Sequence, residues 1–163
     1  MKTLKRRRKE GKTNYLKRIK LLKSGKPRIV LRRTNRYFVV QYVMSDEARD
    51  NAVLGITSKF LLKYGWPENA SGSLKSIPAS YLTGFLIGKM IVRKKMEEPI
   101  ADLGMARAIS KTRVFAFLKG LIDSGVKIKC HEKCFPDDEK IAGGNMKNKI
   151  PFEEIKSKIE NEK

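Results

Sequence analysis

The sequence predicts an α/β fold with a mixed sheet: an antiparallel three-strand meander followed by a βαβαβ unit, helices packed on the sheet, and a basic N-terminal arm. Two observations predict it. Three segments rich in β-branched and aromatic residues follow one another between residues 28 and 57, and the gaps between them are too short for crossover connections. From residue 52 to residue 130, strand patterns then alternate with helix patterns, which implies parallel pairing through right-handed crossovers.

Positive charge is concentrated at the start of the chain. The 163 residues carry a net charge of +20, and residues 1–36 hold sixteen lysines and arginines against one acid, Glu10. A field this uneven indicates a polyanionic partner, and the pI of about 10.1 lies in the range typical of nucleic-acid-binding proteins. We expect residues 1–12 to form a basic arm that becomes ordered only against phosphate.

The segment 14–23 is predicted to form a short helix. Asn14 can cap it, and Tyr15, Ile19 and Leu22 recur on one face at helical spacing. Lysines and an arginine occupy the remaining positions. We therefore expect the apolar stripe to dock on the domain while the cations point outward.

Three strands are predicted at 28–34, 37–44 and 51–57. Cations and the ring of Tyr37 lie at or near the first hairpin, where they can meet a nucleic acid. A solvated strand face and a core tyrosine would explain the same residues.

Next along the chain, Ser58–Tyr64 is expected to make one or two helical turns, capped by Ser58 and ended by Gly65. Trp66–Ile77 is expected to be a loop. Its Lys75 and small polar residues can approach a sugar-phosphate backbone, although a plain surface loop fits the composition equally well.

The longest helix is predicted at Pro78–Lys95. Gly84 and Gly88 thin one side of it, which we expect to let it lie close to the sheet. The remaining expected elements are a strand at 100–105, a helix at 113–123, a last strand at 126–130, a loop at 131–150 and a short helix at 151–160. The expected organisation is an RNA-binding arm with a short helix (1–24), an α/β core domain (25–130) and a C-terminal extension (131–163).

Patterns for catalysis or metal binding are weak. Cys130, His131 and Cys134 are close together, but zinc needs a fourth ligand and no second cluster is present. Asp102 lies on a predicted strand, where a sheet-based nuclease holds a metal, yet no other acid has matching spacing. We expect no catalytic residue, metal or cofactor. We also expect no membrane partner, because the most apolar run, Tyr81–Val92, is too short to cross a bilayer.

Longer stretches of the sequence carry a specific resemblance. The run from Gly11 to Tyr37 reads GKTNYLKRIKLLKSGKPRIVLRRTNRY, and further segments are KYGW at 63–66, SLKSIPASYLTG at 73–84, RVFAFLKG at 113–120 and FPDDE at 135–139. Together they resemble the archaeal large-ribosomal-subunit protein eighteen family, whose eukaryotic relative is large-subunit protein five. The resemblance covers about residues 5–144.

This resemblance implies a non-catalytic, cytoplasmic protein without a metal site. It implies binding to 5S rRNA and attachment of that RNA to large-subunit rRNA in the central protuberance, beside neighbouring ribosomal proteins. The RNA contacts would map onto Arg6, Arg7, Arg8, Lys12, Asn14, Tyr15, Arg18, Lys26, Arg28, Arg32, Arg33, Asn35 and Tyr37. The loop Ser71–Ser76, with Lys75, is a secondary candidate. The family's glycine and proline turn is missing at Ala106–Thr112, so that segment and the tail after Gly144 are assigned no role.

Two other classes of function stay open at this point. One is a metal-dependent nuclease that uses Asp102. The other is a generic DNA-compacting protein, because cations bind the backbones of RNA and DNA alike.

Overall fold

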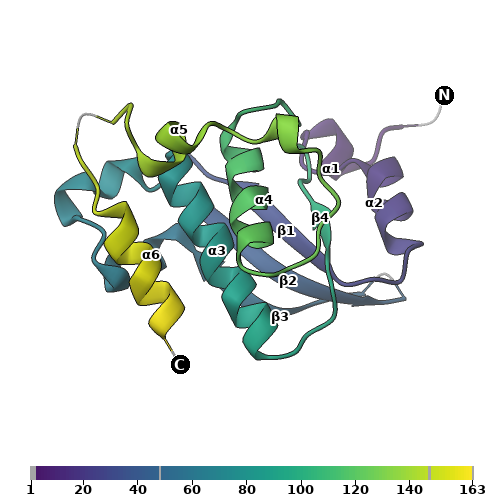
Figure 1. Ribbon diagram of the computed structural model, residues 1–163. Helices are drawn as coiled ribbons and strands as arrows, with labels where there is room; N and C mark the ends of the chain where they lie inside the picture. The colour runs from purple at the N-terminus through teal and green to yellow at the C-terminus, as the bar shows by residue number, and fades with distance from the viewer. Residues whose placement is uncertain (1–2, 48, 147, 163) are drawn as a thin grey trace.

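The computed structural model describes residues 3–47, 49–146 and 148–162 and centres on a sheet with the strand order β3-β2-β1-β4 (Figure 1). Strands β1 (Arg28–Arg33), β2 (Phe38–Asp46) and β3 (Arg49–Thr57) pair antiparallel, and β4 (Ile100–Asp102) runs parallel to β1. This arrangement confirms the predicted α/β fold with its mixed sheet and three-strand meander.

The last predicted strand does not form. In the part of the chain that the structure describes, residues 126–130 make no strand pairing. Val126 instead closes the preceding helix, because its N–H donates to the carbonyl of Leu121, and the apolar side chains Val126, Ile128 and Cys130 pack on the core as an extended segment. Alternating burial therefore arose here without a hydrogen-bonded ladder.

Helices cover one face of the sheet. The helices α3 (Ile77–Arg93) and α4 (Arg113–Asp123) lie in front of it in Figure 1, and α5 (Asp138–Ala142) and α6 (Phe152–Asn161) pack against α3. Apolar side chains from alternate strand positions are buried between these layers: Ile29, Leu31, Phe38, Val40 and Tyr42. None of the helices among the described residues is long and apolar enough to cross a membrane.

The two long helices approach each other closely through glycine. A Cβ atom added to Gly84 would lie 2.3 Å from the carbonyl oxygen of Phe117, and one on Gly88 would lie 1.8 Å from Oγ of Ser124. The expectation that these glycines fit α3 to the sheet is therefore wrong. They fit α3 to α4, because the missing side chains face the neighbouring helix.

Two segments differ locally from the sequence-based expectation. Ser58 does not cap the 3₁₀ helix η1 (Ser58–Tyr64); its buried hydroxyl accepts from the Phe38 N–H at 3.1 Å and donates to the Leu74 carbonyl at 2.8 Å. The expected loop 66–77 contains a second 3₁₀ helix, η2 (Glu68–Ser73), anchored by the buried ring of Trp66. The expected loop 131–150 likewise contains η3 (Glu132–Cys134) and α5.

Candidate nucleic-acid interface

The basic helix α2 (Tyr15–Leu22) and the single helical turn α1 (Arg6–Lys9) lie beyond β4, on the other side of it from α4 (Figure 1). The predicted cap is confirmed, since Oδ1 of Asn14 accepts from the Lys17 N–H at 3.1 Å. The predicted apolar stripe is only partly right, because Ile19 is 50% exposed. The side chain that joins this helix to the sheet is Arg18, whose guanidinium bonds to Asp50 at 2.9 Å.

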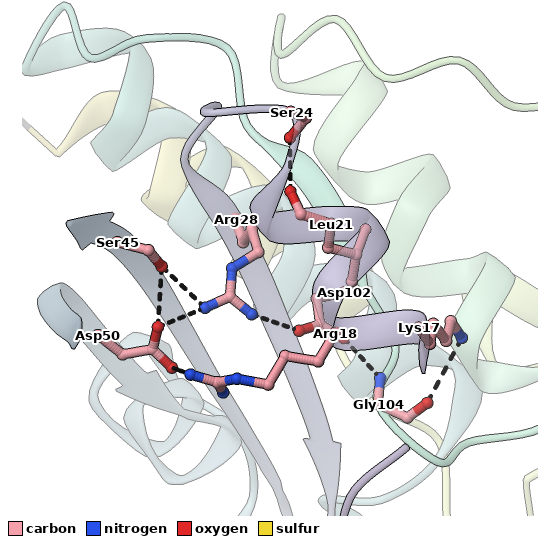
Figure 2. A network of polar contacts seen from close by, with 9 residues as sticks. All are labelled: Lys17, Arg18, Leu21, Ser24, Arg28, Ser45, Asp50, Asp102 and Gly104. Carbon is pink, nitrogen blue, oxygen red and sulfur yellow. Dashed lines mark hydrogen bonds and ion pairs between the residues drawn. The ribbon is translucent and has the colours of Figure 1, made fainter. Parts of the chain in front are cut away.

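A buried arginine lies beneath α2 (Figure 2). Arg28 is 2% exposed, and its guanidinium donates to Asp102 at 2.8 Å, to Asp50 at 2.7 Å and to the Ser45 hydroxyl at 3.0 Å. These bonds connect β1 to each of the other three strands of the sheet. Asp50 also receives Arg18, so the same network fixes α2 to the sheet.

The environment of Asp50 combines opposing effects on its acidity. Desolvation raises the pKa of its carboxyl, but the hydrogen bond from Ser45 and the charges of Arg28 and Arg18 outweigh burial, and the net pKa lies below its ordinary value. Asp50 is therefore a carboxylate at neutral pH, and it balances two arginines at once.

Asp102 is engaged on both carboxylate oxygens. Oδ2 accepts from Arg28, and Oδ1 accepts from the Gly104 N–H at 2.9 Å. The described residues contain no group of three or more metal-binding side chains. The structure thus places Asp102 as a partner of Arg28, and the carboxylate nearest to it in this network, Asp50, is bonded to the same guanidinium.

A pocket of about 290 Å³ opens between the arm, α2 and the sheet. It brings together six of the predicted contact residues: Arg7, Lys12, Asn14, Tyr15, Arg18 and Arg32. Lys17, which the resemblance did not single out, also lines it, and its ammonium donates to the Gly104 carbonyl at 3.4 Å. Five lysines and arginines line this small cavity, against the single carboxylate of Asp102, so its charge is of the sign that attracts the phosphates of a nucleic-acid backbone.

The arm folds back on itself. The chain reverses at Gly11, where φ is +65°, and the carbonyl of Arg7 accepts from the N–H groups of Lys12 and Thr13. Nε of Arg7 also donates to the Thr13 hydroxyl at 3.0 Å. The described residues of the arm, from position 3 onward, therefore fold back on themselves, and the ordering of the arm against phosphate stays a prediction.

The only acidic residue of the arm, Glu10, helps to hold it in this folded-back conformation. Glu10 accepts from Lys12 and from Arg6, each at 2.8 Å, and these two bonds lower the pKa of its carboxyl. Lys5 lies 4.8 Å from the centre of the Tyr15 ring, which joins the arm to α2 by a cation–π contact.

The other predicted contacts lie outside this pocket. The prediction that Arg28 contacts RNA is wrong, because a buried guanidinium held by two carboxylates presents no surface to RNA. Tyr37 is half-buried, with the Lys59 ammonium 4.9 Å from its ring centre. The remaining candidates are exposed on the arm, before β1, at the end of β1, at the first hairpin and after η2: Arg6, Arg8, Lys26, Arg33, Asn35 and Lys75.

Comparison with known proteins gives one consistent family. Residues 1–101 match the family described as ribosomal large subunit proteins 60S L5 and 50S L18. Proteins named large ribosomal subunit protein uL18 are similar to the chain. The one from Korarchaeum cryptofilum is 41% identical over 141 residues, covering 86% of this chain and 70% of that protein. The one from Methanoculleus marisnigri is 42% identical over 146 residues, covering 90% and 81%, and the one from Thermofilum pendens is 40% identical over 143 residues, covering 88% and 71%.

Proposed function

Because the chain belongs to the family of ribosomal large subunit proteins 60S L5 and 50S L18, it is a structural protein of the large ribosomal subunit, and we propose that it binds 5S rRNA. In this proposal it attaches 5S rRNA to large-subunit rRNA in the central protuberance, beside neighbouring ribosomal proteins. It does so without catalysis, by neutralising and positioning RNA.

The observation that carries the proposal is the convergence of cations on the pocket. Arg7 and Lys12 come from the arm, Lys17 and Arg18 from α2, and Arg32 from β1. Each phosphate that these side chains neutralise releases condensed counterions, which supplies affinity for RNA. The proposed contacts are therefore the pocket residues first and, around them, Arg6, Arg8, Lys26, Arg33, Asn35, Tyr37 and Lys75. Arg28 is not among the proposed contacts. Its effect on RNA binding is indirect, because it helps to hold α2 in position.

Pre-organisation supports the same function. The Arg18–Asp50–Arg28 network holds α2 on the sheet before any ligand arrives. Binding then costs less conformational entropy than ordering a free helix would.

Gel-shift titration of the protein with a 5S rRNA transcript, in the presence of excess tRNA, tests the proposal. We expect a stoichiometric complex that tRNA does not displace, and equal competition by tRNA would overturn specific 5S binding. If about eight phosphates are neutralised, the logarithm of the affinity should fall with the logarithm of salt concentration with a slope of about −6 to −7.

The same assay separates the two other classes. Intact RNA after incubation with Mg²⁺ is expected, whereas cleavage abolished by Asp102→Asn would favour a nuclease. Competition by duplex DNA as strong as that by 5S rRNA would favour a DNA-compacting protein.

A further inference from the structure

A larger groove of about 1280 Å³ lies next to the pocket, between the arm and the segment 103–114 that joins β4 to α4. Seven of its lining residues are lysines or arginines, and none of its described lining residues is acidic. The resemblance assigned no role to most of this segment. Two of its cations, Arg107 and Arg113, have no ion-pair partner among the described residues, so their charge is available to a ligand.

The groove is fixed at both ends before a ligand binds. At one end, the Gly104 N–H donates to Asp102 and the Gly104 carbonyl accepts from Lys17. At the other end, Lys111 has a φ of +60°, its N–H donates to the Cys134 carbonyl at 2.8 Å, and its ammonium pairs with Asp137 at 3.2 Å. A non-glycine residue held in this left-handed conformation needs such anchors, and strained backbone of this kind is found preferentially at binding sites.

Apolar side chains are exposed between the cations of the groove. Met105 is 53% exposed and Ile109 is 56% exposed, and both line it. A ligand that covers this surface must carry negative charge and an apolar face together. A nucleotide whose base is unpaired does so, because its phosphate meets the cations while its base lies on the apolar side chains. A double helix keeps the faces of its bases stacked inside and offers the groove its backbone and the polar edges of its bases.

We propose that this groove seats an unpaired stretch of the bound RNA, with Arg107 and Arg113 on its phosphates and Met105 and Ile109 against a base. Arg7, Lys12 and Arg32 line both the groove and the smaller pocket, so one continuous strand can run from one to the other. The proposal rests on the RNA-binding function proposed above and adds to it a second contact region and a preference for single-stranded RNA.

Two double variants of the protein, each titrated with the 5S rRNA transcript, test the role of the cations and the role of the apolar side chains. Arg107→Ala with Arg113→Ala should make the salt slope shallower by about 1.4, which corresponds to two single-strand phosphate contacts. Met105→Ala with Ile109→Ala should weaken binding about tenfold, as expected for a lost base contact, with an unchanged salt slope. The matched controls lie outside the groove: Lys127→Ala with Lys129→Ala for charge, and Val92→Ala for an exposed apolar side chain. Circular dichroism melts verify that every variant is folded.

A photo-crosslinking amino acid at position 109 identifies the RNA that covers the groove. Crosslinks to unpaired nucleotides support the proposal, and crosslinks confined to base-paired helices overturn it. If wild type binds 5S rRNA specifically while both groove double variants bind like their controls, the groove proposal fails and the proposed function stands. If wild type shows no preference for 5S rRNA over tRNA, the proposed function itself fails.

Discussion

Among single residues, Arg28 determines how the RNA-facing side of the molecule is built. Its charge is buried, and its guanidinium bonds to Asp102 and Asp50. A buried arginine of this kind adds little stability compared with a well-packed apolar residue, but removing one partner alone leaves buried charges uncompensated. The main effect of the network is therefore to position α2 on the sheet, and its contribution to stability is secondary.

Arg28→Met is expected to destabilise the protein by about 3–5 kcal/mol, because Asp102 and Asp50 both lose the buried guanidinium and only Asp50 keeps a cation, Arg18. Urea denaturation followed by circular dichroism measures this change. The control is Arg36→Met at the exposed hairpin, which should stay within about 0.5 kcal/mol of wild type. An Arg28→Met variant as stable as the control would show that the network is energetically silent.

The charge of Asp50 makes the stability of the folded protein depend on pH. Its pKa in the folded protein is below the ordinary value of 3.8, so its charge stabilises the fold above that value, and the contribution is lost as pH falls through the lower folded pKa. Asp50→Asn removes the contribution. The free energy of unfolding of this variant should therefore fall less between about pH 5 and about pH 2 than that of wild type. Asp46→Asn, at an exposed position of β2, is the control for the removal of one carboxylate.

Sequence reasoning could not identify the role of Arg28. Its carboxylate partners lie 22 and 74 positions away, and only the registers of β1 with β4, of β1 with β2 and of β2 with β3 bring them together. In the sequence, Arg28 resembles the other arginines of the basic segment. Asn14 was predictable because a helix cap depends on residues only three positions apart.

At the scale of elements, α3 and α4 pack closely against each other at their glycines. Gly84→Ala should destabilise the protein by about 3 kcal/mol, at the upper end of overpacking, because the new methyl group would meet the backbone of α4. Thermal denaturation measures the effect. Gly72→Ala is the matched control, because an added Cβ there meets nothing within 4 Å. Equal melting temperatures for the two variants would contradict the close helix contact.

The elements differ in how well the sequence predicted them. The helix Arg113–Asp123 has the predicted bounds, because its apolar residues recur over three turns and Gly125 follows in the left-handed conformation. The segment 126–130 shows the alternation typical of a strand but forms no strand. Alternation of apolar and polar residues indicates that one face is buried, but it does not indicate whether a neighbouring strand is present to form hydrogen bonds. The pocket was predictable only as a set of basic residues. Its shape depends on how the arm folds back at Gly11.

Considered as a whole, the molecule has two sides that differ in net charge. The arm, α2 and the groove carry most of the net positive charge, whereas residues 132–163, which include α5 and α6, hold eight acids and seven lysines. Figure 1 shows α6 and the arm at opposite ends of the view. A field of this kind orients the protein as it approaches RNA, so that the basic side arrives first.

This asymmetry predicts which cations control the salt dependence of binding. Replacing Arg6, Arg7 and Arg8 together by Ala should weaken binding to 5S rRNA and make the salt slope shallower by about 2, because three phosphate contacts are lost. The matched control removes the same charge elsewhere, through Lys127→Ala, Lys129→Ala and Lys133→Ala at exposed positions. Filter binding over a range of salt concentrations compares the two variants. A slope that changes equally in both would mean that RNA responds only to net charge, whereas a change confined to the arm variant locates the interface on the basic side.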